Sequence, residues 1–558
     1  MNSNSLSFKQ WLKEGIPWIW LCAAAVSASL LMVCGLIGLI AYGGISYFWP
    51  KSLVELNYLK NASTQEIIIG EIHQQETVLK QRIHSFDVPP PEKAEILERW
   101  QVKTGNKEIY GIDFRWINQY QILSQKLPPQ LATIERREWG NIYGEVVAIN
   151  ELGHKLSILD TALLQTSQQR IERANDLFHQ KRAIEKNAIG KINYDMEKLR
   201  LKARKYEIKG ELTPEIQQKL EQSRQILQKK YLDLEQALSV LNTQLNRDSL
   251  VVKIATGQNL ELPLAKIVQL YQPNSMNLWH KLGFLISKIW EFVSDEPREA
   301  NTEGGIFPAI FGTILMVIIM SVVVTPFGVI AAVYLKEYAG QNFLTRAIRI
   351  AVNNLAGVPS IVYGVFGLGF FVYWAGGNID RLFFPEALPS PTFGTPGLMW
   401  CSLTLALLTL PVVIVATEEG LARIPKAIRE GSLALGATKA ETLWRIVLPM
   451  ASPALMTGLI LAVARAAGEV APLMLVGVVK LAPTLPFDTS FPFLHLDRKF
   501  MHLGFHIYDV GFQSPNVEAA RSLVYATSFL LLLVIVALNI SAIAIRNRLR
   551  ERYKTLEN

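Results

Sequence analysis

Six long runs of apolar residues constrain the fold of this chain more than any other feature. Five of them contain no charged residue, and the run at 446–479 contains only Arg465 and Glu469. A helix that crosses a bilayer needs about 20 predominantly apolar residues, and every run exceeds that length. The sequence therefore predicts an all-α polytopic membrane part with six transmembrane helices. The runs lie at 15–50, 304–335, 350–379, 387–417, 446–479 and 522–545.

The orientation of these helices follows from the basic residues beside them. The first run is longer than the apolar core of a secretory signal, which is roughly 7–15 residues, so we expect an uncleaved helix. Lys9 and Lys13 precede it, and basic residues also gather in 336–349, in 418–445 and behind the last run. Because positive residues favour the cytoplasmic side, we expect both termini in the cytoplasm. The segments expected outside are 51–303, 380–386 and 480–521.

The charge balance and the cysteines exclude other classes of protein. The net charge is +8, from 56 Lys and Arg against 48 Asp and Glu. The basic residues cluster next to the apolar runs, so we interpret the charge as a sign of membrane topology and expect no nucleic-acid partner. Cys22, Cys34 and Cys401 all lie inside apolar runs. Neither a disulfide framework nor a zinc site is therefore expected.

The polar region between the first two runs is expected to form an α+β domain outside the cytoplasm. Short alternating, β-rich pieces occur at 95–117, at 139–150 and at 250–254. Such pieces are typical of half-buried strands. We assign 51–276 to this domain.

A helical hairpin is expected inside the α+β domain, at about 152–247. This stretch is helical in period, and from 213 to 247 its apolar positions repeat in steps of three and four, as in a coiled coil. Gly210 to Pro214 predicts the turn, with Pro214 at a first helical position. We expect the first arm to break near Gly190.

The segment 277–305 is expected to contain an amphipathic helix followed by a linker. Its predicted apolar face consists of Leu278, Leu282, Leu285, Ile289 and Val293. This helix is expected either to lie on the outer membrane surface or to pack against the outer domain. The other expected divisions of the chain are 1–50, the N-terminus with the first helix; 306–545, the main membrane domain; and 546–558, a basic cytoplasmic tail.

The segment 430–449, within the expected cytoplasmic loop 421–450, is the candidate for transmitting work. It can form two short helices broken at Gly436, where a residue without a side chain permits a sharp turn. Pro449 is expected to end the loop and begin the next span. Such an element can dock in a groove of a soluble partner, with Leu435 and Trp444 as apolar anchors. The alternative is an ordinary amphipathic loop. The residues assigned to this contact are Glu430, Gly431, Ser432, Leu435, Gly436, Ala437, Trp444, Ile446, Leu448 and Pro449.

The same segment resembles the "EAA" loop of ABC importer permeases. Gly431 and Ser432 stand where alanines are usual in that family. The resemblance implies the type I ABC importer permease fold, with this loop as the coupling helix to an ATPase on a separate chain. The residues at the family spacing are Glu430, Gly436, Ile446, Leu448 and Pro449.

Three further stretches, 325–338, 355–364 and 464–473, resemble the phosphate-specific PstA type of these permeases. The resemblance covers about 305–545 and implies import of inorganic phosphate across a bacterial inner membrane. It implies no cofactor in this chain, since ATP and Mg²⁺ are bound by the ATPase. The implied partners are a homologous PstC-like permease subunit, a PstB-like ATPase dimer, a periplasmic PstS-like phosphate-binding protein and membrane lipid.

Arg465 and Glu469 are the candidate residues of the substrate pathway. A charge within a span costs roughly 2.5–3.5 kcal/mol on insertion scales, so such residues are paired or face a cavity. Their spacing of four residues places both on one face of a helix. Arg465 is suited to hydrogen-bond a passing phosphate, and Glu469 to hold it in place. The alternative is a structural ion pair that joins two spans.

No enzyme is expected in this chain. It contains no GxxxxGK[ST] phosphate loop, no nucleophile elbow and no HExxH pattern. His502 and His506 are spaced like metal ligands, but no third ligand stands out, and we predict no metal site. Two other functions stay open: transport of another oxyanion such as molybdate or sulfate, and a membrane-anchored coiled-coil scaffold or sensor.

Overall fold

The chain is a multi-pass membrane protein. The computed structural model describes residues 12, 15–61, 63–82, 88–91, 95–156, 160–298, 303–340, 342–488, 490–514 and 517–554. Six helices in this part of the chain are long and apolar enough to span a membrane, as predicted. Lys9 and Lys13, on which the predicted orientation of the N-terminus rests, lie outside the described residues. The six helices are Pro17–Tyr47, Phe307–Tyr338, Ser360–Phe383, Leu398–Ala422, Lys439–Gly468 and Ala520–Arg548.

Three of these helices differ from the predicted runs, in each case close to a proline. The fourth begins at Leu398 rather than at 387, after Pro396. The third span begins at Ser360, because Pro359 disfavours helix in the residue before it. The fifth ends at Gly468, and Glu469 is extended, so the predicted apolar run is split in two. Pro472, which has no N–H to donate, lies in the short helix that follows. The shorter elements are α9 (Phe343–Leu355), before the third span, and α16 (Ala471–Val476), after the fifth.

The centre of the membrane part is α12 (Leu398–Ala422), which packs against α8 (Phe307–Val333) and α15 (Leu448–Gly468). Small residues allow this close packing, as is common between helices in membranes. A Cβ on Gly458 would lie only 2.5 Å from Ala416, and a Cβ on Gly420 only 2.6 Å from Ala454. These two approaches fix the antiparallel register of α12 and α15.

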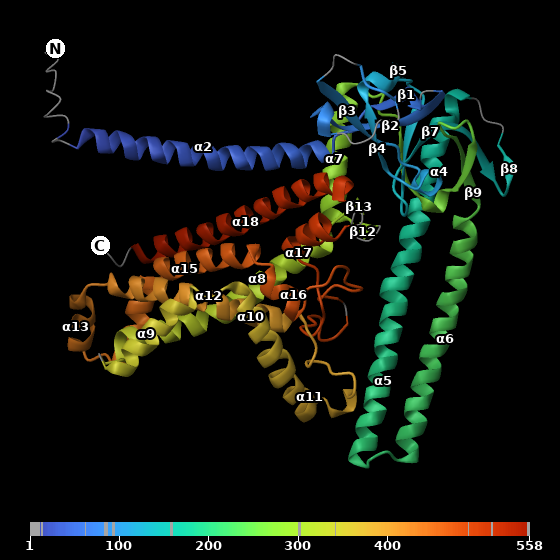
Figure 1. The fold of residues 1–558 in the computed structure, drawn as a ribbon. Coiled ribbons are helices and arrows are strands. Elements are labelled where there is room, and N and C mark those ends of the chain that lie inside the picture. Colours follow the sequence, from blue (N-terminus) through green and yellow to red (C-terminus); the bar gives the residue numbers. More distant parts are fainter. Residues whose placement is uncertain are drawn as a thin grey trace.

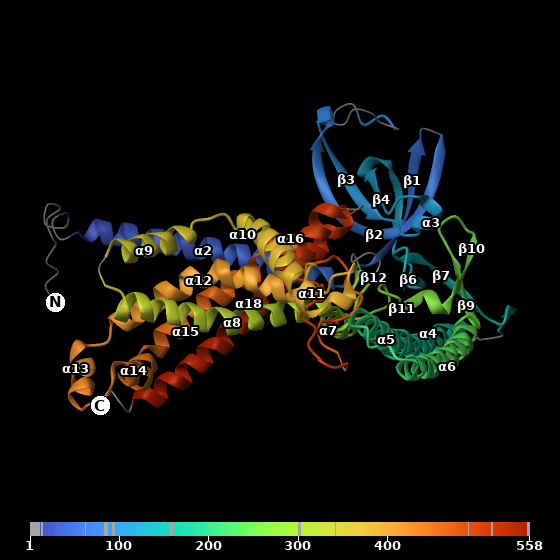
Figure 2. The ribbon, with the colours of Figure 1, turned by 90° about the horizontal axis from the view of Figure 1, so that it is seen from below.

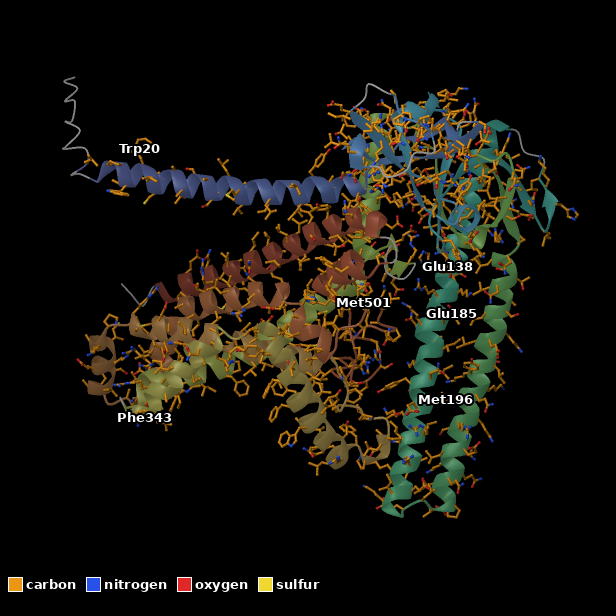
Figure 3. All side chains as sticks on the ribbon, in the orientation of Figure 1. Trp20, Glu138, Glu185, Met196, Phe343 and Met501 are labelled. Atoms are coloured by element: carbon orange, nitrogen blue, oxygen red, sulfur yellow. The ribbon has the colours of Figure 1, made fainter. Side chains whose placement is uncertain are left out.

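The first and last spans, α2 (Ile16–Tyr47) and α18 (Val517–Lys554), meet only near the α+β domain. Gly43 and Gly44 of α2 lie against Tyr525 and Phe529 of α18. The rest of α2 stands apart from the other helices, and Trp20 projects away from them (Figure 3). Most of α2 therefore faces lipid or a partner that spans the membrane.

The α+β domain consists of two antiparallel sheets at one end of the spans (Figure 1). The first sheet has the strand order β4-β3-β2-β1-β5, and the second has β10-β9-β7-β6-β11, with β8 beside β7. The predicted strands near 95–117, 139–150 and 250–254 are present, whereas β1 and β2 were not predicted. The strands are β1 (Leu53–Asn61), β2 (Thr64–Leu79), β3 (Ile96–Lys103), β4 (Phe114–Asn118), β5 (Ile122–Lys126), β6 (Leu131–Arg136), β7 (Ile142–Glu151), β8 (His154–Lys155), β9 (Asp248–Lys253), β10 (Asn259–Pro263) and β11 (Ile267–Tyr271).

The helical hairpin is inserted between β7 and β9, which pair with each other. The predicted turn is present: Gly210 has a φ of 69°, and Pro214 begins the second arm. The prediction of a break near Gly190 is wrong. The first arm continues through a π-helical turn at 184–189, which accommodates the irregularity without ending the helix. The arms are α4 (Asp160–Ala183) with α5 (Gly190–Lys209), and α6 (Pro214–Leu245).

Figure 1 shows the hairpin running across the direction of the membrane helices beyond their end, and Figure 2 shows it nearly end-on at the same end. Two polar contacts attach it to loops between the spans. The Tyr194 hydroxyl donates to the Phe491 carbonyl oxygen at 3.0 Å, and Lys205 pairs with Glu386 at 3.2 Å. The hairpin is therefore positioned over the end of the bundle opposite to the predicted coupling loop.

The amphipathic helix α7 (Leu278–Ser294) connects the α+β domain to α8, as predicted. On the predicted apolar face of α7, Leu282, Leu285 and Ile289 are half-buried, whereas Leu278 is exposed. The large side chains that α7 exposes include Trp279 and Trp290. The remaining short elements are α3 (Lys107–Tyr110), β12 (Pro297–Arg298), β13 (Glu303–Gly304), α10 (Ser360–Phe366), α11 (Gly377–Phe383), α13 (Lys426–Ala434), α14 (Lys439–Thr442) and α17 (Leu503–Tyr508).

Candidate functional site

The segment 430–449 lies at the end of the bundle opposite to the α+β domain, on the side where α18 ends (Figures 1 and 2). Its two short helices are α13 and α14, separated at Gly436 as predicted. Gly436 has a φ of 88°, a left-handed conformation that favours glycine. Thr438 caps α14, where Glu441 reaches back to form a capping box.

The second short helix is continuous with the fifth span, so Pro449 does not separate the loop from the span. Helix runs from Lys439 to Gly468 and contains a π-helical turn at 443–447. This turn directly precedes Pro449, which has no N–H to complete the regular α-helical pattern. A displacement of α14 would therefore be carried directly into the span.

The loop is attached to the bundle by polar contacts that the sequence did not single out. The buried hydroxyls of Ser432 and Thr442 lie 2.8 Å apart and join α13 to α14. Arg429 pairs with Glu337 at 3.0 Å and donates to the Leu421 carbonyl oxygen at 2.6 Å. The loop is therefore a rigid unit with the ends of α8 and α12. In the sequence, the only sign that Arg429 helps to attach the loop is its position next to Glu430.

The outer surface of this loop carries exposed apolar side chains. Leu435 is 90% exposed and Trp444 is 73% exposed. Glu430 and Gly431 are also exposed, beside them on α13. Of the other predicted contact residues, Ala437, Ile446, Leu448 and Pro449 are half-buried and Ser432 is buried. An exposed tryptophan and leucine on a rigid polar loop are typical of an interface whose partner is not present.

Arg465 and Glu469 lie close together, although Glu469 is not on the helix. The Nε atom of Arg465 is 3.6 Å from Oε1 of Glu469. Glu469 caps α15 with an extended backbone, so the predicted position of both residues on one helical face is wrong. The Glu469 carboxylate reaches the Arg465 guanidinium instead from the extended residue that directly follows the helix.

The depth of Arg465 follows from the register of α12 and α15. Gly458 lies opposite Ala416, and seven residues further along α15 brings Arg465 level with about Thr409, near the middle of α12. The Arg465 side chain is nevertheless 34% exposed. A charged group half-way across a membrane does not face hydrocarbon at low cost. The face beside Arg465 is therefore one that protein or water covers.

The residues that the structure describes contain no group of three or more His, Cys, Asp or Glu side chains arranged to hold a metal. His502 and His506 are both buried near the start of α17. Burial lowers the pKa of His502 to about 3, and burial together with Lys480 lowers the pKa of His506 to about 4. Both side chains are therefore neutral at physiological pH and act as packed core residues.

Comparisons with known proteins agree with this arrangement. Residues 324–555 match the family described as "Binding-protein-dependent transport system inner membrane component". The "Phosphate transport system permease protein PstA" of Mycobacterium leprae is 34% identical over 245 residues, which cover 44% of this chain and 71% of that protein. The chain therefore belongs to the family of binding-protein-dependent inner membrane transport components.

Other matches differ in how much of their sequence they share with this chain. The "Probable ABC transporter permease protein YqgH" of Bacillus subtilis is 32% identical over 211 residues, or 38% of this chain and 62% of that protein. Among solved structures, the inward-facing MetNI methionine ABC transporter covers 49% of this chain and 99% of its own, at 18% identity and a TM-score of 0.30. The family match begins at residue 324, so the α+β domain and hairpin lie outside it.

Proposed function

We propose that this chain is the permease subunit of an ABC importer that carries inorganic phosphate across the inner membrane. The observation that carries the proposal is the loop 430–449. It exposes Leu435 and Trp444, and its second helix continues directly into the fifth span. Such a loop receives a movement from a soluble partner and passes it to the membrane helices. The partner is an ATPase dimer that binds ATP and Mg²⁺, since this chain has no phosphate loop.

The proposed orientation places the loop and both termini in the cytoplasm and 51–303 in the periplasm. It is supported by the basic residues near the loop end of the bundle, which include Arg346, Arg423 and Arg546. The α+β domain and the hairpin lie at the opposite end (Figure 1). In this orientation the hairpin crosses the outer mouth, where a periplasmic phosphate-binding protein delivers its cargo.

The proposed cargo rests on two observations. Relatives that match this chain are phosphate transport permeases by name, including the Mycobacterium leprae protein. Within the membrane, Arg465 offers a guanidinium group, whose planar fork of donors fits phosphate oxygens. We assign Arg465 to the substrate pathway, at an interface with a second, homologous permease subunit. Glu469 positions Arg465 and limits how tightly the anion is held.

Uptake of labelled phosphate tests this proposal. The complex is reconstituted in vesicles with ATP on the cytoplasmic side, and sulfate and molybdate are added as competitors. We expect ATP-dependent uptake that excess phosphate competes and the other anions do not. A hydrogen bond to a charged group contributes about 1.5–3 kcal/mol, so Arg465→Ala should lower uptake at limiting phosphate by roughly ten- to a hundredfold.

Two controls make this test specific. Arg224 is an exposed arginine on the hairpin, and Arg224→Ala should leave uptake unchanged. Arg465→Lys keeps the charge but not the fork, and should restore uptake only in part. Competition by sulfate or molybdate would assign another oxyanion. Normal uptake by the Arg465→Ala complex would remove Arg465 from the pathway, and an assembled complex with no ATP-dependent uptake would favour a scaffold or sensor.

A further inference from the structure

The amphipathic helix α7 carries an exposed apolar strip on one face. Trp279 is 79% exposed, Ile286 is 66% exposed and Trp290 is 72% exposed. The steps of seven and four residues place these three side chains above one another on a helix. Gly283 lies between them with no atom within 4 Å of where its Cβ would be. The strip is therefore continuous and open.

A second side of α7 is occupied by the α+β domain. The Phe284 ring packs on Tyr271 of β11, with the ring centroids 4.5 Å apart. Lys288 pairs with Glu135 of β6 at 2.6 Å and with Glu291 of α7 at 2.7 Å. These contacts fix the rotation of α7 about its own axis relative to the domain.

A third side of α7 is occupied by the ends of the membrane helices. Phe292 is buried against Phe48, directly after α2, with the ring centroids 5.1 Å apart. The Phe292 carbonyl oxygen accepts from the N–H of Ile306, one residue before α8. The helix is therefore held at the level where α2 ends and α8 begins.

The direction of α7 is also informative. Figure 1 shows it running across the direction of the spans, at the end where they meet the domain. Figure 2, turned by 90°, shows α7 close to the same end of α8. A helix at that level and in that direction lies in the plane of the membrane surface.

The geometry points to the lipid surface as the partner of this strip. Tryptophan is enriched where hydrocarbon meets the headgroups, because its ring is apolar and its N–H is polar. The angular positions of Phe284 and Lys288 on α7 are opposite to those of Trp279 and Ile286, so the strip points away from the domain. We infer that Trp279, Ile286 and Trp290 insert into the outer leaflet and anchor the α+β domain beside the spans.

The sequence left two placements open for Leu282, Leu285 and Ile289, which were expected to face either the membrane surface or the outer domain. The three side chains are half-buried, because the packing of Phe292 and Lys288 turns them partly inward. Large apolar side chains occur around most of α7, so the sequence alone does not determine which face is exposed. The contacts of α7 with β6 and β11 leave the tryptophan face open.

Nitroxide accessibility in vesicles tests the inference. Cys22 and Cys34 are replaced by alanine in the full-length chain, and Cys401 stays because it is fully buried. A single cysteine is then introduced by Trp279→Cys or Ile286→Cys and spin-labelled. The labelled chain is reconstituted with its co-purified subunits in vesicles of phosphatidylcholine and phosphatidylglycerol.

The two relaxation agents are oxygen, which concentrates in lipid, and a water-soluble nickel chelate. The logarithm of the ratio of oxygen accessibility to nickel accessibility should be positive for Trp279→Cys and Ile286→Cys. It should be negative for the matched control Ser287→Cys, next to Ile286 on the exposed polar side of α7. Each position is exposed, so the substitutions should leave folding intact.

Two other results would overturn the inference. A negative value at both strip positions would show that the strip faces water. Low accessibility to both agents would show that another protein subunit covers it. The readout does not depend on transport, so its failure and the failure of the proposed phosphate function are distinguishable.

Discussion

Removal of the Trp444 side chain is the perturbation that most sharply separates a coupling loop from an ordinary loop. Trp444 makes up much of the exposed apolar surface of 430–449, and it is 73% exposed in the chain alone. A buried tryptophan covers about 150–250 Å², so about 150 Å² is available to a partner. At about 25 cal/mol per Å², covering that area contributes at most about 4 kcal/mol.

The measurable loss is smaller than this limit, because association and imperfect packing carry costs. We expect Trp444→Ala to weaken binding of the ATPase by about 2 kcal/mol, which is roughly a thirtyfold rise in Kd. The assay is titration of the purified ATPase onto the permease in nanodiscs. The thermal unfolding of the permease itself should not change, because the side chain makes little contact within the chain.

Trp279→Ala is the matched control, because it removes an equally exposed tryptophan from the opposite end of the bundle. It should leave the Kd for the ATPase unchanged. The reasoning is refuted if both variants bind the ATPase as tightly as the unchanged chain, or if both weaken binding to the same extent.

Three further changes have defined outcomes. Gly436→Val forces a β-branched residue into a left-handed backbone conformation, at a cost of about 1–3 kcal/mol. Stimulation of the ATPase by the permease should fall while the spans stay folded, and unchanged stimulation would mean that the turn is not required. Lys288→Met removes the cation that Glu135 and Glu291 share. It should lower the free energy of unfolding of the α+β domain by about 3 kcal/mol, measured by amide hydrogen exchange. Unchanged amide protection would show that the two ion pairs are dispensable. Burial holds the pKa of His502 at about 3 in the folded protein, below the value of about 6.5 in the unfolded chain. As the pH falls below 6.5, the unfolded chain therefore takes up a proton that the folded protein does not, and the free energy of unfolding decreases. At pH 5.5 the loss is about 1.4 kcal/mol, and His502→Asn should reduce the shift in Tm between pH 7.5 and 5.5.

The number of the spans and their approximate positions could be predicted from the sequence, because a bilayer imposes one length and one composition on each of them. The hairpin was equally predictable, since its apolar stripe has the period of a helix and its turn contains Gly210 and Pro214. Strands β1 and β2 were missed. Their sequences mix apolar residues with many polar ones, and only the pairing of the two strands shows which face is buried.

The two short helices of the loop were predictable from the sequence, but the attachment of the loop to the bundle was not. The pattern at 430–449 predicts two helices and an exposed anchor, and the structure has both. The attachment of the loop through Arg429 and Glu337 joins residues far apart in the sequence, so no local pattern reveals it. The same limit applies to Arg465 and Glu469, because the end of α15 at Gly468 is followed by α16, which packs against α10 and α12.

The sidedness of the loop is the most direct test of this account. A cysteine introduced by Leu435→Cys, in a chain that lacks Cys22 and Cys34, is treated with a membrane-impermeant maleimide in vesicles of known orientation. Labelling should occur only in inside-out vesicles and should be blocked when the ATPase is bound. Labelling from the outer side of right-side-out vesicles would contradict the account, because a loop on that side cannot contact a cytoplasmic ATPase.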